Sequence, residues 1–121
     1  IHLLRVRNDV PSILRSADVF VFPSRTEGLP NALMEAMAAG LPIVTTGAPG
    51  CRDLIQPGVT GLVVPIDDAK ALAAAVQRLL SAPTFGDRLG AAARQYAERN
   101  LLLTKSFESY LEMYRTVLDS Q

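Results

Sequence analysis

A short apolar run that leads directly into a turn and then into helix formers places the strongest constraint on this fold. Residues 19–22 read Val-Phe-Val-Phe, and Pro23 ends the run. Such a run of β-branched and aromatic residues is typical of a strand buried on both faces of a parallel sheet. Residues 30–39 begin with Pro30 and are strong helix formers, and Gly40 supplies a stop. The stretch therefore predicts a strand–loop–helix unit.

The same alternation recurs along the first half of the chain. Further short apolar runs predict strands at residues 1–4, 43–46 and 61–65. Short helices are expected at residues 10–16, with Asp9 as N-cap, and within residues 51–55, whereas residues 47–50 predict a loop. Strands that alternate with short helices indicate an α/β fold, with an open parallel sheet and flanking helices as in Rossmann-like proteins.

The second half of the chain predicts two or three consecutive helices. The first is capped by Asp67 or Asp68, and its apolar stripe comprises Leu72, Val76, Leu79 and Leu80. The second begins near Thr84 and is weakened by Gly86 and Gly90; its apolar positions are Phe85, Leu89, Ala92, Ala93 and Tyr96. The third is capped by Thr104 and presents Phe107, Tyr110, Leu111, Tyr114 and Leu118 on one side. We interpret residues 1–121 as a single, incomplete domain.

Composition excludes several classes of function. Lys plus Arg and Asp plus Glu both number 12, so no global charge would attract nucleic acid. One cysteine, Cys51, and one histidine, His2, argue against an internal disulfide, a metal site and a histidine-based catalytic triad. No apolar run reaches the roughly 18 residues of a membrane span, and no signal peptide is visible. A cytoplasmic setting is expected.

The loop after residues 19–22 is placed to bind a phosphate. In open α/β sheets ligands lie beyond the carboxyl ends of the strands, and a helix start presents unpaired N–H groups. Because Pro30 has no N–H, the expected donors are the amides of Asn31, Ala32 and Leu33. Gly28 would let a ligand approach the backbone without a side chain in the way.

Two carboxylates bracket this helix start. Glu35 lies five residues beyond Pro30, which is about 7–8 Å along a helix axis, comparable to the separation of a ribose from its β-phosphate. Glu27 lies just ahead of the helix, where a sugar beyond the diphosphate would sit. A glutamate inside a helix is more often a solvated residue. Glu35, however, is surrounded by Leu, Met and Ala, and a buried carboxylate needs a partner.

With Ser24, Glu27-Gly28-Leu29-Pro30 and residues 35–44, the stretch 19–46 resembles the signature of family 4 retaining glycosyltransferases of the GT-B fold, described as glycosyl transferases group 1. The Glu-x7-Glu pattern of that family is matched by Glu27 and Glu35. The likeness continues through residues 47–50, 53–55 and 58–65 and the helix that begins near Asp68. It implies the GT-B C-terminal, donor-binding half.

The resemblance also implies roles for individual residues. Glu35 would hold the donor ribose, and Glu27 would contact the hydroxyls of the transferred sugar as the catalytic residue. The remaining donor-binding positions would be Gly28, Leu29, Pro30, Asn31 and Ala32. The donor would be a nucleotide diphosphate sugar, transferred with retention to an acceptor hydroxyl, without a metal or other cofactor.

The resemblance implies partners as well. The acceptor-binding N-terminal domain and the basic pair that neutralises the diphosphate would precede residue 1, so the fragment alone is expected to be inactive. Any peripheral membrane contact would be made through that missing half. The Tyr110 and Tyr114 stripe is expected to pack, and its exposure in a fragment would favour self-association. Position 5 is Arg where the family usually has Gly.

Other readings stay open at this point. A non-catalytic α/β module that binds a nucleotide or a partner would share the same fold. A dinucleotide dehydrogenase would need a Gly-x-Gly-x-x-Gly turn, which the sequence lacks. Arg25 could reach a phosphate or be a solvated charge. Gly47 and Gly50 could admit a ligand or form a simple turn, and Cys51 is expected to be a packing residue.

Overall fold

The computed structural model describes residues 1–101 and 105–120, and for residues 105–110 it describes the backbone alone. The strands are β1 (Phe20–Phe22), β2 (Ile43–Thr46) and β3 (Leu62–Val64). The helices are α1 (Val10–Ser16), α2 (Asn31–Ala39), α3 (Pro49–Leu54), α4 (Ala69–Ser81), α5 (Pro83–Asn100) and α6 (Lys105–Asp119). The order of the elements confirms the predicted α/β class with consecutive helices at the end.

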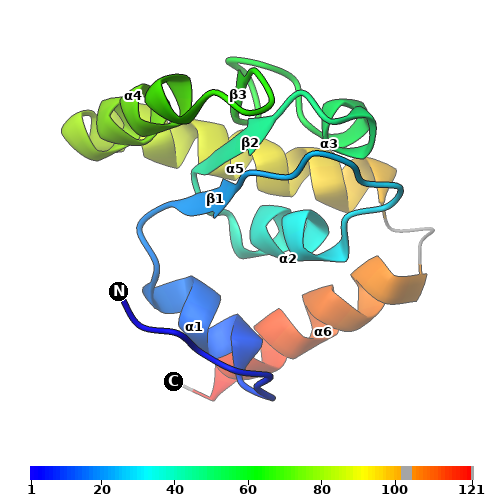
Figure 1. Cartoon of the computed structure of the whole chain (residues 1–121). Helices are drawn as coiled ribbons and strands as arrows, with labels where there is room; N and C mark the ends of the chain where they lie inside the picture. The colour runs from blue at the N-terminus through cyan, green and yellow to red at the C-terminus, as the bar shows by residue number, and fades with distance from the viewer. Residues whose placement is uncertain (102–104, 121) are drawn as a thin grey trace.

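The three strands form a parallel sheet in the order β1-β2-β3. Figure 1 shows α2 between this sheet and the pair α1 and α6, which lie side by side. Helix α4 contacts β2 and β3, and α5 contacts both α2 and α4. Both faces of the sheet are thus covered by helices, as a parallel sheet requires.

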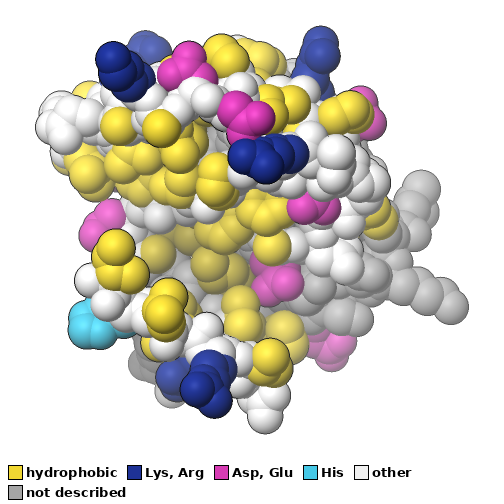
Figure 2. All heavy atoms as spheres, in the orientation of Figure 1, with side chains coloured by type: hydrophobic (Ala, Val, Ile, Leu, Met, Phe, Trp, Pro, Cys, Tyr) yellow, Lys and Arg dark blue, Asp and Glu magenta, His cyan; other side chains and the backbone are white. Residues whose placement is uncertain are grey.

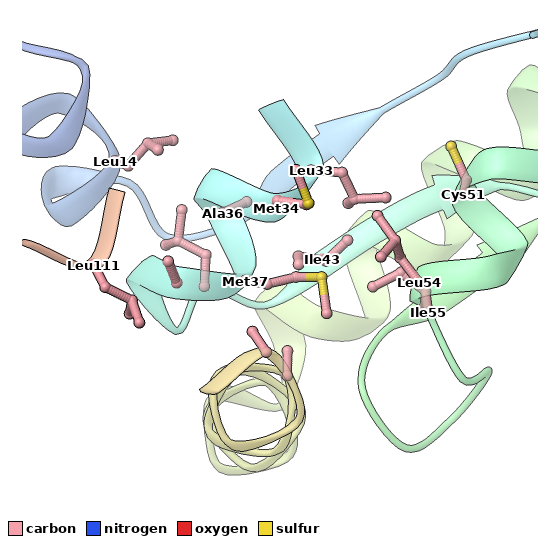
Figure 3. Packing of buried hydrophobic residues seen from close by; sticks show 14 of the residues in the cluster. Leu14, Leu33, Met34, Ala36, Met37, Ile43, Cys51, Leu54, Ile55 and Leu111 are labelled. Atoms are coloured by element: carbon pink, nitrogen blue, oxygen red, sulfur yellow. The ribbon is translucent and has the colours of Figure 1, made fainter. Parts of the chain in front are cut away.

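Strand β2 is the centre of this arrangement because all of its residues are buried. Successive side chains of a strand point to opposite faces. Accordingly, Ile43 packs in the larger hydrophobic cluster with α2, and Val44 packs in a second cluster with β3 and α4. Figure 3 shows Ile43 in the larger cluster, near Met37 of α2 and Ile55, which follows α3. The prediction of a strand at residues 43–46 is confirmed, and the structure shows in addition that this strand is fully buried.

The prediction that residues 19–22 are buried on both faces is wrong. Phe20 and Phe22 are half-buried against the larger cluster, but Val21 is 37% exposed. In the register of the sheet Val21 lies beside Val44, on the face covered by α4. Because β1 stands at the edge of the described sheet and α4 contacts β2 and β3, Val21 stays open to solvent.

The first nine residues also differ from expectation. Residues 1–4 form no strand and are exposed, because no described strand pairs with them. Asp9 occupies the N-cap position of α1, but its side chain makes no capping hydrogen bond. Instead, Arg7 donates from Nε and Nη2 to the two Asp9 oxygens at 2.6 and 2.8 Å, and these hydrogen bonds lower the pKa of the Asp9 carboxyl.

Two other boundaries need correction. Helix α3 begins at Pro49, so half of the predicted loop at residues 47–50 is helical. Proline is favoured at the first position of a helix, and this signal outweighs the loop tendency of the neighbouring glycines. In α4, Asp68 caps the helix by accepting from the amide of Ala71 at 2.9 Å, as predicted. Leu80, expected in its apolar stripe, is 53% exposed.

The glycines of α5 do not simply weaken that helix. A Cβ built at Gly90 would approach the carbonyl oxygen of Gly40 to well under 3.0 Å. Gly40 itself ends α2 with a φ of 73°, as predicted for its C-terminal stop. Gly90 therefore allows α5 to cross directly over the end of α2.

Helix α6 packs with Leu111 and Tyr114, which are 3% exposed and belong to the larger cluster. These two residues are covered within the chain, so they offer no surface for the self-association expected from the tyrosine stripe. Leu118 is 41% exposed. The predicted cap at Thr104 and the side chains of Phe107 and Tyr110 lie outside the described residues.

Candidate functional site

The predicted site lies at the carboxyl edge of the sheet. Residues 23–30 connect the end of β1 with the start of α2, and the parallel strands β2 and β3 end at the same edge. A cavity of about 250 Å³ opens there between Pro23, Thr46 and the first turn of α4. A larger groove of about 610 Å³ lies between α1 and α6. The predicted site residues line neither of these two cavities.

Three hydrogen bonds hold the loop before α2. The Thr46 hydroxyl at the end of β2 donates to the carbonyl oxygen of Ser24. The Ser24 hydroxyl lies 3.0 Å from Oε1 of Glu27, and the amide of Gly50 donates to the carbonyl oxygen of Glu27 at 3.1 Å. Glu27 is thus held through both its backbone and its side chain.

Gly50 is required for this contact. A Cβ built on it would approach the carbonyl oxygens of both Glu27 and Gly28 to well under 3.0 Å. The first turn of α3 can therefore lie against the Glu27–Gly28 peptide only because residue 50 has no side chain. A backbone contact inside the protein explains Gly50. This contact is neither the ligand approach nor the simple turn predicted for residues 47 and 50.

The other side of the loop is open. A Cβ at Gly28 would meet nothing within 4 Å, and Leu29 is 58% exposed. Pro30 is buried and precedes the first helical residue, while Asn31 and Ala32 are exposed. A ligand can therefore approach the start of α2 along the backbone of residues 28–32.

One of the three predicted amide donors is already engaged. The amide of Leu33 donates to the carbonyl oxygen of Pro30 at 3.1 Å, because the first turn of α2 tightens around Pro30. The amides of Asn31 and Ala32 precede this turn and have no intrahelical acceptor by helix geometry. Together with the positive end of the helix dipole they favour a phosphate.

Glu35 lies on the accessible side of α2. Leu33, Met34, Ala36, Met37 and Ala38 are fully buried, whereas Glu35 is half-buried. Residues four apart share a helix face, so Glu35 follows the exposed Asn31 by one turn. The start of α2 therefore has Glu27 ahead of it and Glu35 one turn inside it, both reachable from solvent.

Arg25, considered as a phosphate ligand, has another partner. Its Nε lies 2.7 Å from Oδ1 of Asp67 in an ion pair that is largely exposed. Asp67 has a φ of 61° and stands in the loop between β3 and α4. On the face of the molecule drawn in Figure 2, Lys and Arg side chains are spread out and interspersed with Asp and Glu, and they form no single basic patch.

Sequence reasoning missed three residues that shape the loop. Ser24 was noted only as part of the family signature, Thr46 was given no role, and Gly50 was considered only as a glycine that admits a ligand or forms a turn. A serine three residues before Glu27 was the available signal for the first, since Ser side chains often bond locally in turns. The contacts of Thr46 and Gly50 join segments more than 20 residues apart, and no local pattern encodes them.

Fold and site together define an α/β protein in which two carboxylates flank the exposed start of a helix at the carboxyl edge of the sheet. The family profile described as Glycosyl transferases group 1 matches residues 1–82 of the 121. The chain belongs to this glycosyltransferase family.

Curated relatives agree with this assignment. A capsular polysaccharide biosynthesis glycosyltransferase (CapM) of Staphylococcus aureus is 31% identical over 116 residues, which cover 96% of this chain and 30% of that protein. A UDP-Gal:alpha-D-GlcNAc-diphosphoundecaprenol alpha-1,3-galactosyltransferase of Escherichia coli is 38% identical over 77 residues, 64% of this chain and 20% of that protein. The chain thus spans less than a third of the length of these relatives.

Solved structures share the fold. Sucrose-phosphate synthase of Thermosynechococcus elongatus is 31% identical with a TM-score of 0.73 over 90% of this chain and 27% of that one. The C-terminal domain of a glycosyl transferase group 1 protein (LpcC) of Francisella tularensis has a TM-score of 0.74 at 22% identity, over 84% and 52%. Anabaena HepE in complex with UDP-glucose has a TM-score of 0.74 at 20% identity, over 95% and 31%. The fold is therefore that of the C-terminal half of GT-B glycosyltransferases.

Two kinds of feature are absent from the part of the chain that the structure describes. None of the described helices has the length and apolar character needed to cross a bilayer. Within the same residues, no three or more His, Cys, Asp or Glu side chains gather as metal ligands do.

Proposed function

We propose that this chain is the donor-binding part of a glycosyltransferase that uses a nucleotide diphosphate sugar. The observation that carries the proposal is the start of α2. Its amides at Asn31 and Ala32, which have no acceptor within the helix, follow the carboxyl end of β1, and Glu27 and Glu35 flank them on the solvent-accessible side. Such a helix start suits a diphosphate, and carboxylates suit hydroxyl groups on either side of it.

The residues have separate roles in this proposal. Glu35 accepts hydrogen bonds from the ribose diol, and the amides of Asn31 and Ala32 contact the diphosphate. Glu27 contacts the hydroxyls of the transferred sugar as the catalytic residue. Gly28, Leu29 and Pro30 shape the backbone that the ligand approaches, and the open space at Gly28 supports this role. The helix start stabilises negative charge that develops on the leaving diphosphate.

The names of related proteins support a uridine nucleotide as the donor. The galactosyltransferase of Escherichia coli uses UDP-Gal by its name, and HepE was solved with UDP-glucose. Transfer of a hexose with retention, without a metal, and to an acceptor bound by a preceding N-terminal domain belongs to the proposal as well. So does the cytoplasmic setting, with any membrane contact made by that other domain.

The test is nucleotide binding by the full-length protein and its Glu35→Gln variant. We expect UDP affinity, measured by calorimetry, to fall about 10- to 100-fold, because the neutral amide replaces a charged acceptor. The control is Glu98→Gln, a half-buried glutamate of α5 that pairs with Arg94 away from the site. Unchanged UDP affinity in Glu35→Gln would reject the ribose contact.

A non-catalytic nucleotide-binding module remains the alternative, because binding alone does not demonstrate transfer. Release of UDP from UDP-glucose or UDP-galactose in the presence of acceptor distinguishes the two. We expect Glu27→Gln to lower this release far more than it lowers UDP affinity, since Glu27 is placed beside the sugar. Tight UDP binding without turnover on any sugar acceptor would favour the module.

A further inference from the structure

The hydroxyl group of Ser24 has two acceptors within reach. It lies 3.0 Å from Oε1 of Glu27 and 3.2 Å from the carbonyl oxygen of Thr26. A hydroxyl carries one proton, and a carboxylate is a stronger acceptor than a carbonyl group. Ser24 therefore donates to Glu27, which fixes one of the two carboxylate oxygens.

Ser24 is itself held from the core. Thr46 is 3% exposed and ends the fully buried strand β2. Its hydroxyl donates a hydrogen bond to the carbonyl oxygen of Ser24. The same hydroxyl accepts a hydrogen bond from the amide of Ala48 at 3.4 Å. A series of hydrogen bonds thus runs from the buried centre of the sheet through Ser24 to the Glu27 side chain.

The hydrogen bond from Ser24 engages Oε1 of Glu27 and leaves the second carboxylate oxygen for a ligand. A carboxylate offers about four acceptor positions, and Ser24 uses one on Oε1. The Gly50 amide holds the Glu27 backbone at the same time. Little rotamer freedom is left to the side chain, so binding a sugar does not have to order it again.

We propose that Ser24 is a positioning residue for the transferred sugar, acting by orienting the Glu27 carboxylate, and that Thr46 supports it. The inference rests on the proposed function, in which Glu27 meets the sugar. It goes further by separating recognition of the sugar from recognition of the nucleoside diphosphate. Ser24 acts on the first and leaves the second to Asn31, Ala32 and Glu35.

The test compares two probes on the full-length protein by calorimetry: UDP, and whichever of UDP-glucose or UDP-galactose the wild type binds. We expect Ser24→Ala to weaken binding of the UDP-sugar about 10-fold and to leave UDP affinity unchanged. Ser24→Thr keeps the hydroxyl and should restore most of the lost affinity. Thr46→Val, of nearly equal volume, should show the same selectivity more weakly and provides a second variant if Ser24→Ala does not fold.

A double-mutant cycle tests whether the effect passes through Glu27. In a Glu27→Ala background, Ser24→Ala should change UDP-sugar affinity no further. Parallel loss of UDP and UDP-sugar affinity would show a purely structural role and overturn the proposal, as would additive effects in the cycle. Unchanged UDP-sugar affinity in Ser24→Ala, with normal UDP binding by the wild type, would overturn this inference alone. A wild type that binds neither probe would overturn the proposed function.

Discussion

Gly50→Ala is expected to disrupt both the stability of the protein and its function. A methyl group at residue 50 would overlap the carbonyl oxygens of Glu27 and Gly28, which are backbone atoms and cannot rotate away. Overpacking of this kind costs about 1–3 kcal/mol of unfolding free energy. Ala is a better helix former than Gly by about 0.8–1.0 kcal/mol. Because this gain offsets part of the clash, the clash itself costs more than the net destabilisation that is measured.

The functional consequence follows from the same contact. Relief of the clash requires the Glu27–Gly28 peptide to move away from α3, and a displacement near 1 Å can lower transfer about 100-fold. Chemical denaturation and the rate of UDP release would measure the two effects. Gly47→Ala is the matched control, because its Cβ would make only an ordinary 3.6 Å contact with Arg52. If Gly50→Ala behaved like Gly47→Ala, the described approach of α3 to the loop would be incorrect.

Gly90→Ala is expected to destabilise the protein although it lies in the middle of a helix. Its Cβ would overlap the carbonyl oxygen of Gly40, so α5 would have to move away from the end of α2. We expect a loss of about 1–3 kcal/mol of unfolding free energy in denaturant titrations, opposite in sign to the helix propensities.

The neighbouring exposed Ala91 provides the comparison for this variant. Ala91→Gly should cost about 0.5–1 kcal/mol through backbone entropy alone. Both substitutions should therefore destabilise α5, one by adding a methyl group and the other by removing one. A stabilising Gly90→Ala would mean that α5 and α2 are not in close contact in solution.

Local patterns predicted the fold well where the relevant force is local. The Pro30 start and Gly40 end of α2 and the Asp68 cap of α4 depend on a few consecutive residues, and they were found within a residue or two of expectation. The apolar run at residues 43–46 forms the strand β2 as predicted. The class of fold followed from these elements.

The predictions were wrong where contacts with other parts of the structure determine whether a side chain is buried or which group it bonds to. Val21 has the same sequence character as Val44, yet Val21 is exposed and Val44 is buried. In the sheet that the structure describes, only β2 has a strand on each side. Asp9 is of a residue type that favours the N-cap, but its carboxylate accepts hydrogen bonds from Arg7 instead of capping α1. The sequence cannot reveal which partner such a side chain will meet.

The candidate site divides in the same way. The carboxylates Glu27 and Glu35 and the helix start between them were found from spacing and from resemblance, and their roles in binding stay predictions. The support beneath them comes from Thr46 and Gly50, whose contacts cross between segments. A ligand-facing residue can be recognised by its chemistry, whereas a residue that holds it is recognised only by its geometry.

The packing of α5 separates the family signature from the unit that folds. The profile ends at residue 82, before α5 begins at Pro83. Yet α5 supplies Leu89 to one hydrophobic cluster and Ala93 and Ala97 to the other. A protein cut at the end of the signature would keep Glu27, Glu35 and the helix between them but lose the surface on which that helix rests. The segment that matches the family profile is therefore shorter than the segment that packs around the shared hydrophobic core.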